Sequence, residues 1–164
     1  MTANPPRIYL DACVLLSYVN DAPDRADVVQ SLLEDAEDGK VHLLTSNLSI
    51  AEVAYIASDQ EPSDGTDDEA TIDELWTPDS PVMLAEFTRL VAHRARSIIR
   101  KARDNETARV RSADAVHLAT AEINECDRFY TYEGESRRNG WDPLIQADVS
   151  EPYVDAPRLP SVDY

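Results

Sequence analysis

Four acidic side chains in separate parts of the chain lie beside apolar segments, where carboxylates could do metal-assisted chemistry. Three of them come at or soon after the carboxyl end of a strand-like run, and one opens an apolar helical run. In chain order these acids are Asp11, Glu52, Asp114 and Glu133. Sites in an open parallel α/β sheet form at the carboxyl ends of its strands. We therefore expect the four carboxylates to meet at one edge of a sheet.

Carboxylates that meet in this way repel one another strongly where the dielectric constant is low. Mg²⁺ or Mn²⁺ would relieve the repulsion, since these hard cations prefer oxygen ligands and keep several waters. Such an ion can activate a water, orient a phosphate and stabilise the charge that develops during hydrolysis. The pattern favours a divalent-metal site suited to phosphodiester hydrolysis.

Each acid also has a purely structural interpretation. Asp11 could cap the helix after the first strand, and Ser49 with Glu52 matches the capping-box pattern S-x-x-E. Asp114 could favour the positive end of its helix, and Glu133 could be a solvated loop residue. However, caps work with serine or threonine and do not require acids on four separate segments. The joint pattern therefore favours a shared site.

Apolar periodicity predicts an alternation of strands and helices. The expected strands cover residues 7–10, 41–44, 82–84, 128–132 and 149–154, and the expected helices cover residues 14–19, 24–38, 46–58, 66–76, 88–103 and 112–124. This order indicates an α/β domain with a largely parallel sheet between helical layers. We expect one domain over residues 1–150, with an acidic insertion at about 59–79, and an extended tail over 151–164.

The composition narrows the class of protein. A chain of 164 residues that is 43% hydrophobic can bury its own core. No apolar run approaches the roughly 20 residues of a membrane span, and the N-terminus lacks a signal peptide, so the expected compartment is the cytoplasm. Cys13 and Cys126 form no CxxC or Cys/His cluster, which argues against a zinc site and a disulfide framework. The net charge of -17 argues against generic nucleic-acid binding.

Four segments, taken in order, resemble the motifs of PIN-domain ribonucleases of the VapC-type toxin branch of toxin–antitoxin pairs. They are residues 10–16 (LDACVLL), 49–53 (SIAEV), 112–121 (SADAVHLATA) and 129–133 (FYTYE). The third segment is the most specific, and the resemblance covers about residues 7–135. It implies a three-layer α/β/α sandwich and a metal-dependent endoribonuclease that is frequently a homodimer and is inhibited by a small antitoxin.

By position, the resemblance makes Asp11, Glu52 and Asp114 the acids of the metal site. We predict that Asp11 and Asp114 bind Mg²⁺ or Mn²⁺, that Glu52 completes the site, and that a water attacks the phosphorus of the RNA in line. His117 lies three residues after Asp114 and so shares its helix face. We expect His117 to support the acids or to pack in the core rather than to act in catalysis.

The fourth acid departs from the family pattern. The resembling proteins usually carry an aspartate two residues after a threonine, whereas here Glu133 follows Thr131, with Glu135 as an alternative. We expect Glu133 to complete the site and Thr131 to position a water or phosphate. Cys13 is expected to pack beside the site rather than to react.

The helix expected at residues 88–103 concentrates positive charge in an otherwise acidic chain. Its basic stripe recurs at positions i, i+7, i+11 and i+14 and consists of Arg89, Arg96, Arg100 and Arg103. The arginine fork suits phosphate oxygens. The stripe therefore contacts RNA or an acidic antitoxin tail in one interpretation. In the other it is a solvated face paired with the acidic insertion.

Metal-dependent cleavage of RNA is the function that these residues favour. The main alternative is a catalytically impaired PIN-like module that acts through protein or RNA binding, because Glu133 replaces an aspartate. Phosphoryl transfer through an aspartyl nucleophile fits poorly. A haloacid-type phosphatase would need an aspartate where Cys13 stands, and a receiver domain would need a late lysine, but no lysine follows Lys101.

Overall fold

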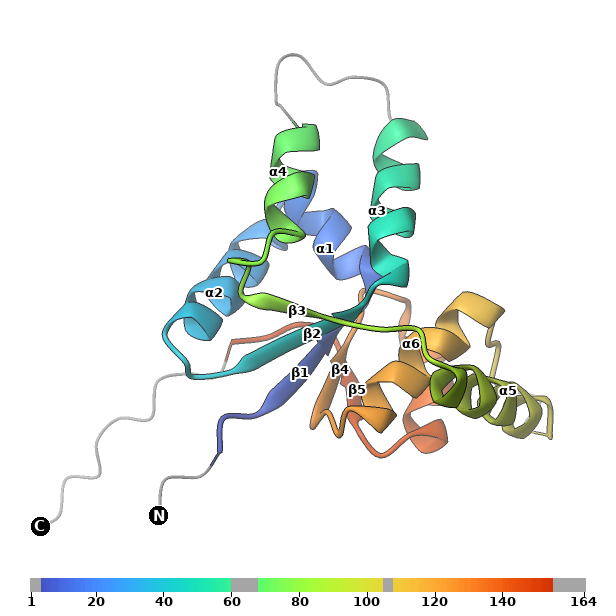
Figure 1. Cartoon of the computed structure of the whole chain (residues 1–164). Coiled ribbons are helices and arrows are strands. Elements are labelled where there is room, and N and C mark those ends of the chain that lie inside the picture. The colour runs from blue at the N-terminus through green and yellow to red at the C-terminus, as the bar shows by residue number, and fades with distance from the viewer. Residues whose placement is uncertain (1–3, 60–67, 105–107, 155–164) are drawn as a thin grey trace, which may run out of the picture.

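The computed structural model describes residues 4–59, 68–104 and 108–154. Five strands form a parallel sheet (Figure 1). In sheet order they are β3 (Val82–Ala85), β2 (His42–Ser46), β1 (Arg7–Leu10), β4 (Arg128–Tyr130) and β5 (Asp148–Ser150). The chain builds outward from β1 to β3 on one side and from β4 to β5 on the other. The topological switch point therefore lies between β1 and β4.

Helices cover both faces of this sheet, which confirms the predicted three-layer α/β/α architecture (Figure 1). One layer contains α1 (Ala12–Val19), α2 (Ala26–Glu37) and α4 (Asp68–Leu75), and the other contains α5 (Arg89–Asp104), α6 (Ser112–Ile123), α7 (Glu135–Trp141) and a 3-10 turn (Asp142–Leu144). Helix α3 (Leu48–Asp59) begins at the carboxyl end of β2 and packs beside α1.

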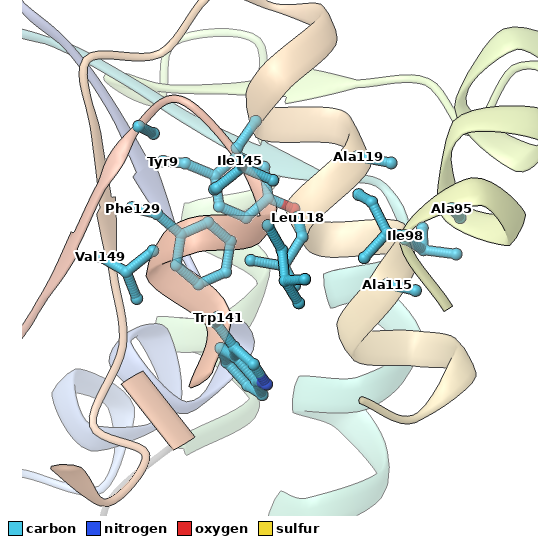
Figure 2. Packing of buried hydrophobic residues seen from close by; sticks show 14 of the residues in the cluster. Tyr9, Ala95, Ile98, Ala115, Leu118, Ala119, Phe129, Trp141, Ile145 and Val149 are labelled. Atoms are coloured by element: carbon cyan, nitrogen blue, oxygen red, sulfur yellow. The ribbon is translucent and has the colours of Figure 1, made fainter. Parts of the chain in front are cut away.

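Alternating side chains on the central strands reach both helical layers. Tyr9 of β1 and Phe129 of β4 face α6, and their rings stack with centroids 5.1 Å apart (Figure 2). Leu10 and Tyr130 belong to the core on the opposite face. Because both faces are covered, the central strands must be apolar on both sides, as parallel strands commonly are. The sequence shows this as unbroken apolar runs.

Helices α5 and α6 pack closely because small residues line their contact. Ile98 and Ala95 of α5 lie against Ala115 and Ala119 of α6 (Figure 2). A partly buried, hydrogen-bonded ion pair between Arg94 of α5 and Glu122 of α6 also joins the two helices. The packing at Ala115 holds the first turns of α6, which carry one of the predicted site acids, against α5, and the Glu122 ion pair holds its last turn.

Most predicted boundaries were wrong by one to four residues, and the shifts in the last strand and in α3 have a clear cause. The last strand is Asp148–Ser150 rather than 149–154, because Pro152 has no backbone N–H for a ladder. Helix α3 begins at Leu48, after a turn in which the Ser46 hydroxyl accepts the Leu48 N–H at 3.2 Å. Helix α6 begins at Ser112, as predicted, with Arg111 as its N-cap.

Parts of two predictions fall outside the described residues, namely 60–67 of the acidic insertion and 155–164 of the tail. The remainder of the insertion includes α4, whose Ile72 and Leu75 are buried as the short amphipathic helix requires. The boundary expected at residue 150 stays a prediction. None of the described helices is both long enough and apolar enough to span a membrane.

Candidate active site

The candidate site lies at the carboxyl ends of β1 and β4, on either side of the switch point. Asp11 follows β1, and its backbone N–H donates to the carbonyl of Tyr130 at 3.0 Å. Thr131 follows β4 and is fully buried. Sites in open α/β sheets form at such switch points. The topology therefore brings Asp11 to the edge at which the sequence predicted a site.

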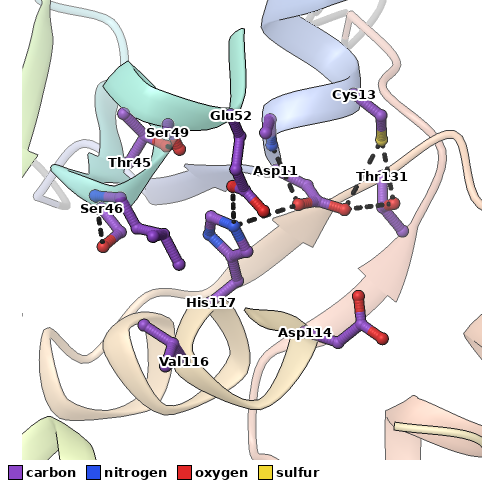
Figure 3. A network of polar contacts seen from close by, with 12 residues as sticks. Asp11, Cys13, Thr45, Ser46, Ser49, Glu52, Asp114, Val116, His117 and Thr131 are labelled. Carbon is purple, nitrogen blue, oxygen red and sulfur yellow. Dashed lines mark hydrogen bonds and ion pairs between the residues drawn. The ribbon is translucent and has the colours of Figure 1, made fainter. Parts of the chain in front are cut away.

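Hydrogen bonds from Ala12, Cys13 and Thr131 hold the Asp11 carboxylate (Figure 3). One carboxylate oxygen, Oδ1, accepts the N–H of Ala12 at 2.9 Å, so Asp11 does cap α1. The other, Oδ2, accepts the Thr131 hydroxyl at 2.8 Å and lies 3.5 Å from the Cys13 sulfur. Capping and a place in the site are therefore compatible, because the cap fixes the carboxylate at the sheet edge.

Glu52 reaches across from α3 to α6 rather than back to its own helix. Its Oε2 lies 2.6 Å from Nε2 of His117, and that nitrogen is 3.9 Å from Oδ1 of Asp11 (Figure 3). The Ser49 hydroxyl instead lies 2.7 Å from that of Thr45. The capping-box interpretation of these two residues was therefore wrong, and Glu52 belongs with Asp11.

His117 is buried behind these acids, with 3% of its side chain exposed. Its second ring nitrogen, Nδ1, lies 2.7 Å from the hydroxyl of Tyr9. Burial lowers the pKa of His117, but the hydrogen bond to Glu52 and the charges of Asp11, Glu52 and Asp114 outweigh it, so that pKa lies above its usual value. The His117 imidazole therefore interacts electrostatically with all three acids.

Tyr9 belongs to this network although the sequence motifs did not single it out. It stands two residues before Asp11, whose extended backbone continues β1, and residues two apart share one face of an extended segment. That spacing was the available signal. The Tyr9 oxygen also accepts the backbone N–H of Ser46 at 2.9 Å, so it connects β2 with His117.

Asp114 lies in the first turn of α6, where its Oδ2 accepts the N–H of Arg111 at 2.8 Å. Burial raises the pKa of Asp114, and the charge of Asp11 raises it further, against the Arg111 hydrogen bond and the charge of Arg137. The carboxylates of Asp11 and Asp114 therefore repel each other across the site, as expected for converging acids (Figure 3).

Glu133 joins the site through Arg137, a basic residue outside the sequence motifs. The Glu133 N–H donates to the Thr131 hydroxyl at 3.2 Å, and its Oε1 pairs with Arg137 at 3.1 Å. The charge of Arg137 also lowers the pKa of Asp114. Arg137 lies four residues after Glu133, a spacing typical of ion pairs. Glu135, the alternative fourth acid, is exposed in the first turn of α7.

The donor set fits a hard cation by its chemistry. Asp11, Glu52 and Asp114 offer carboxylate oxygens. Burial is the main cause of the raised pKa of Asp114, and a cation would offset the repulsion from Asp11 that adds to it. In the part of the chain that the structure describes, no three His, Cys, Asp or Glu side chains are close enough to hold a metal ion. The acids thus share an edge of the sheet without forming a coordination shell.

The remaining predicted residues lie outside this group or are unreactive. The four arginines of the basic stripe are exposed on α5, opposite its buried apolar residues. Both cysteines are free thiols. Burial raises the pKa of Cys13 and of Cys126 to about 12, so thiolate is scarce at neutral pH. Cys13 therefore packs beside Asp11 as an inert group.

Comparison with known proteins gives a family for the chain. The model of a family described as "PIN domain" matches residues 8–141, which include Asp11, Glu52, Asp114 and Glu133. No curated protein matches the chain.

Several solved structures share the fold. The chain superposes on VapBC2 from Rickettsia felis, solved with a promoter DNA fragment, with a TM-score of 0.67 and 12% identity over 88% of this chain and 98% of that chain. Mycobacterium tuberculosis VapC20, described as a sarcin–ricin loop cleaving toxin, gives a TM-score of 0.60 and 16% identity over 81% and 95%. FitAcB from Neisseria gonorrhoeae gives 0.61 and 20% identity over 88% and 97%.

Proposed function

The chain belongs to the PIN domain family, and from that premise we propose that it is an endoribonuclease that hydrolyses RNA with the help of Mg²⁺ or Mn²⁺. The observation that carries the proposal is the convergence of three acids, one directly after β1, one on α3 and one on α6. Asp11 and Glu52 meet at His117, and Asp11 raises the pKa of Asp114. Repulsion among such partly buried carboxylates destabilises the fold unless a bound cation or a proton relieves it, and groups of this kind are typical of functional sites.

Each residue then has a defined task. Asp11 and Asp114 would hold the ion, with Glu52 and Glu133 completing the site. The bound ion would supply Lewis acidity for a water and for the scissile phosphate. Thr131 orients Asp11 through the 2.8 Å hydrogen bond to Oδ2. Arg137 pairs with Glu133 and lies near Asp114, where a positive charge would also face an incoming phosphate.

We also propose that the nuclease is the toxin of a toxin–antitoxin pair in the cytoplasm, forms a homodimer and is inhibited by a small antitoxin. The support is the shared fold with VapC20, a toxin that cleaves the sarcin–ricin loop, and with the VapBC2 and FitAcB structures. The exposed arginines of α5 would bind phosphates of the RNA or an acidic segment of the antitoxin.

A binding module without nuclease activity is the second candidate. The contact between Glu133 and Arg137 favours it, because a glutamate whose charge is already paired has less to offer an ion. This alternative predicts a folded protein that binds RNA or a protein partner and cuts nothing.

The experiment that separates the two is cleavage of a mixed, structured RNA pool by antitoxin-free protein. Mn²⁺ should support cutting, a chelator should stop it, and Asp114→Asn should abolish it while the protein remains folded. Asp127→Asn is the matched control, because Asp127 also accepts a backbone N–H at 2.8 Å but lies at the opposite end of β4. A fully active Asp114→Asn protein would contradict the site, and a folded wild-type protein that cuts nothing would favour the binding module.

A further inference from the structure

A continuous chain of hydrogen bonds runs from the backbone of β2 to a site carboxylate. The N–H of Ser46 donates to the Tyr9 oxygen at 2.9 Å, and that oxygen lies 2.7 Å from His117 Nδ1. His117 Nε2 lies 2.6 Å from Glu52 Oε2. Four elements contribute, namely β2, β1, α6 and α3. These hydrogen bonds connect the Glu52 side chain to the sheet, although Glu52 stands on a helix that extends beyond the sheet (Figure 1).

The Tyr9 hydroxyl is a rigid reference point. Its ring is fully buried, stacks on Phe129 with 7° between the ring planes and contacts the edge of His117. The His117 ring presents Nε2 to Glu52 only in the orientation in which its Nδ1 faces the Tyr9 hydroxyl. A hydroxyl can donate to a bare Nδ1 or accept from a protonated one, so it holds the imidazole in this orientation in either protonation state.

We propose that Tyr9 is a positioning residue of the active site, whose hydroxyl orients His117 so that His117 holds Glu52 beside Asp11. The proposal rests on the proposed function. The Glu52 side chain is 28% exposed, so without a fixed partner it would sample several rotamers. Groups that orient metal-binding side chains typically contribute 10–100-fold in metal affinity or activity. Tyr9 would belong to that class although it contacts none of the acids by a hydrogen bond.

The test compares Tyr9→Phe with Tyr130→Phe. Both substitutions remove one hydroxyl from a fully buried ring on adjacent strands, but the Tyr130 hydroxyl donates to the Tyr153 carbonyl at 3.2 Å on the other face of the sheet. We expect Tyr9→Phe to weaken Mn²⁺ binding, measured by electron paramagnetic resonance, by about tenfold. The kcat for RNA should fall by a similar factor while KM stays unchanged. Tyr130→Phe should change neither.

Two outcomes would overturn the proposal. One is wild-type Mn²⁺ affinity and kcat in Tyr9→Phe. The other is an equal loss in both variants, since that would reflect weaker packing of the sheet rather than the orientation of His117. Comparable melting temperatures of the two variants would establish that the stability costs are matched.

A second measurement covers the case in which Tyr9→Phe does not fold. Long-range ¹H–¹⁵N spectra of the wild-type protein should show the proton of His117 on Nε2, with the signals assigned by their loss in His117→Gln. A bare Nε2 with a protonated Nδ1 would refute the arrangement. This readout also separates the two proposals: a wild-type protein that neither binds Mn²⁺ nor cuts RNA refutes the proposed function, and the nitrogen assignment alone then decides the orientation of His117.

Discussion

Thr131→Val is a sharp test of how the site is built, because it changes one hydroxyl for a methyl group of similar size. Thr131 is fully buried, donates to Asp11 Oδ2 at 2.8 Å and accepts the N–H of Glu133 at 3.2 Å. A hydrogen bond to a charged group contributes about 1.5–3 kcal/mol, and an unpaired buried donor costs about 1–3 kcal/mol. Since Glu133 is partly exposed, its N–H can recover part of that cost. We expect the free energy of unfolding to fall by about 2–4 kcal/mol.

Urea unfolding followed by circular dichroism would measure this decrease. For a chain of this size it corresponds to a melting temperature lower by roughly 10 °C. Thr120→Val is the control, because Thr120 is equally buried but its hydroxyl donates at 2.7 Å only to the carbonyl of Val116 in its own helix. That variant should be destabilised by less than about 1 kcal/mol. Equal destabilisation of the two variants would refute the claim that the hydrogen bond from Thr131 to Asp11 contributes more than a hydrogen bond within a helix, whereas Thr131→Ser should recover most of the difference.

Three further predictions concern charge. Burial raises the pKa of Cys13 and Cys126 from 9.0 to about 12, so iodoacetamide at pH 8 should label the folded chain roughly a thousandfold more slowly than the urea-unfolded chain. Rapid labelling of the folded chain, detected by mass spectrometry, would contradict this. Because folding raises the pKa of Asp114, ionisation of this carboxyl group destabilises the fold at a pH above its unfolded pKa. At pH 7 the Asp114→Asn variant should therefore unfold at the same urea concentration as the wild-type protein or at a higher one. Any gain in stability should disappear in acid, where Asp114 is protonated. Replacing Arg96 and Arg100 by Gln should raise the KM for RNA. It should also make the slope of log affinity against log salt concentration shallower by about one for each phosphate that is no longer neutralised. An unchanged slope would indicate that the arginines of α5 bind another partner.

The layer architecture could be predicted because it depends on local patterns. Unbroken apolar runs such as residues 8–10 predict strands covered on both faces, and the spacing of Val91, Ala95, Ile98 and Ala102 predicts a helix with one buried side. All four of these α5 residues are buried in the structure. The order of the strands required the tertiary structure, because side chains facing apolar layers on both sides pack equally well beside several neighbours.

The sequence placed the acids at the sheet edge, because parallel strands all end on the same side. It could not assign their partners. Ser49 and Glu52 satisfy the local capping-box pattern, yet Glu52 lies 2.6 Å from His117, which is 65 residues away. A pairing over such a separation depends on how α3 and α6 approach each other, and no local pattern encodes that approach.

The sequence by itself determined which residues could do chemistry and on which edge of the sheet they would lie, since residue type and periodicity are local properties. Only the tertiary structure decided how they are arranged. It brought the Asp11 carboxylate near enough to Asp114 to raise the pKa of Asp114, and it paired Glu133 with Arg137. It also connected Tyr9 through His117 to Glu52. These relations join residues that are distant in the chain, and hydrogen bonds and charge interactions act over a few ångströms in space rather than along the sequence.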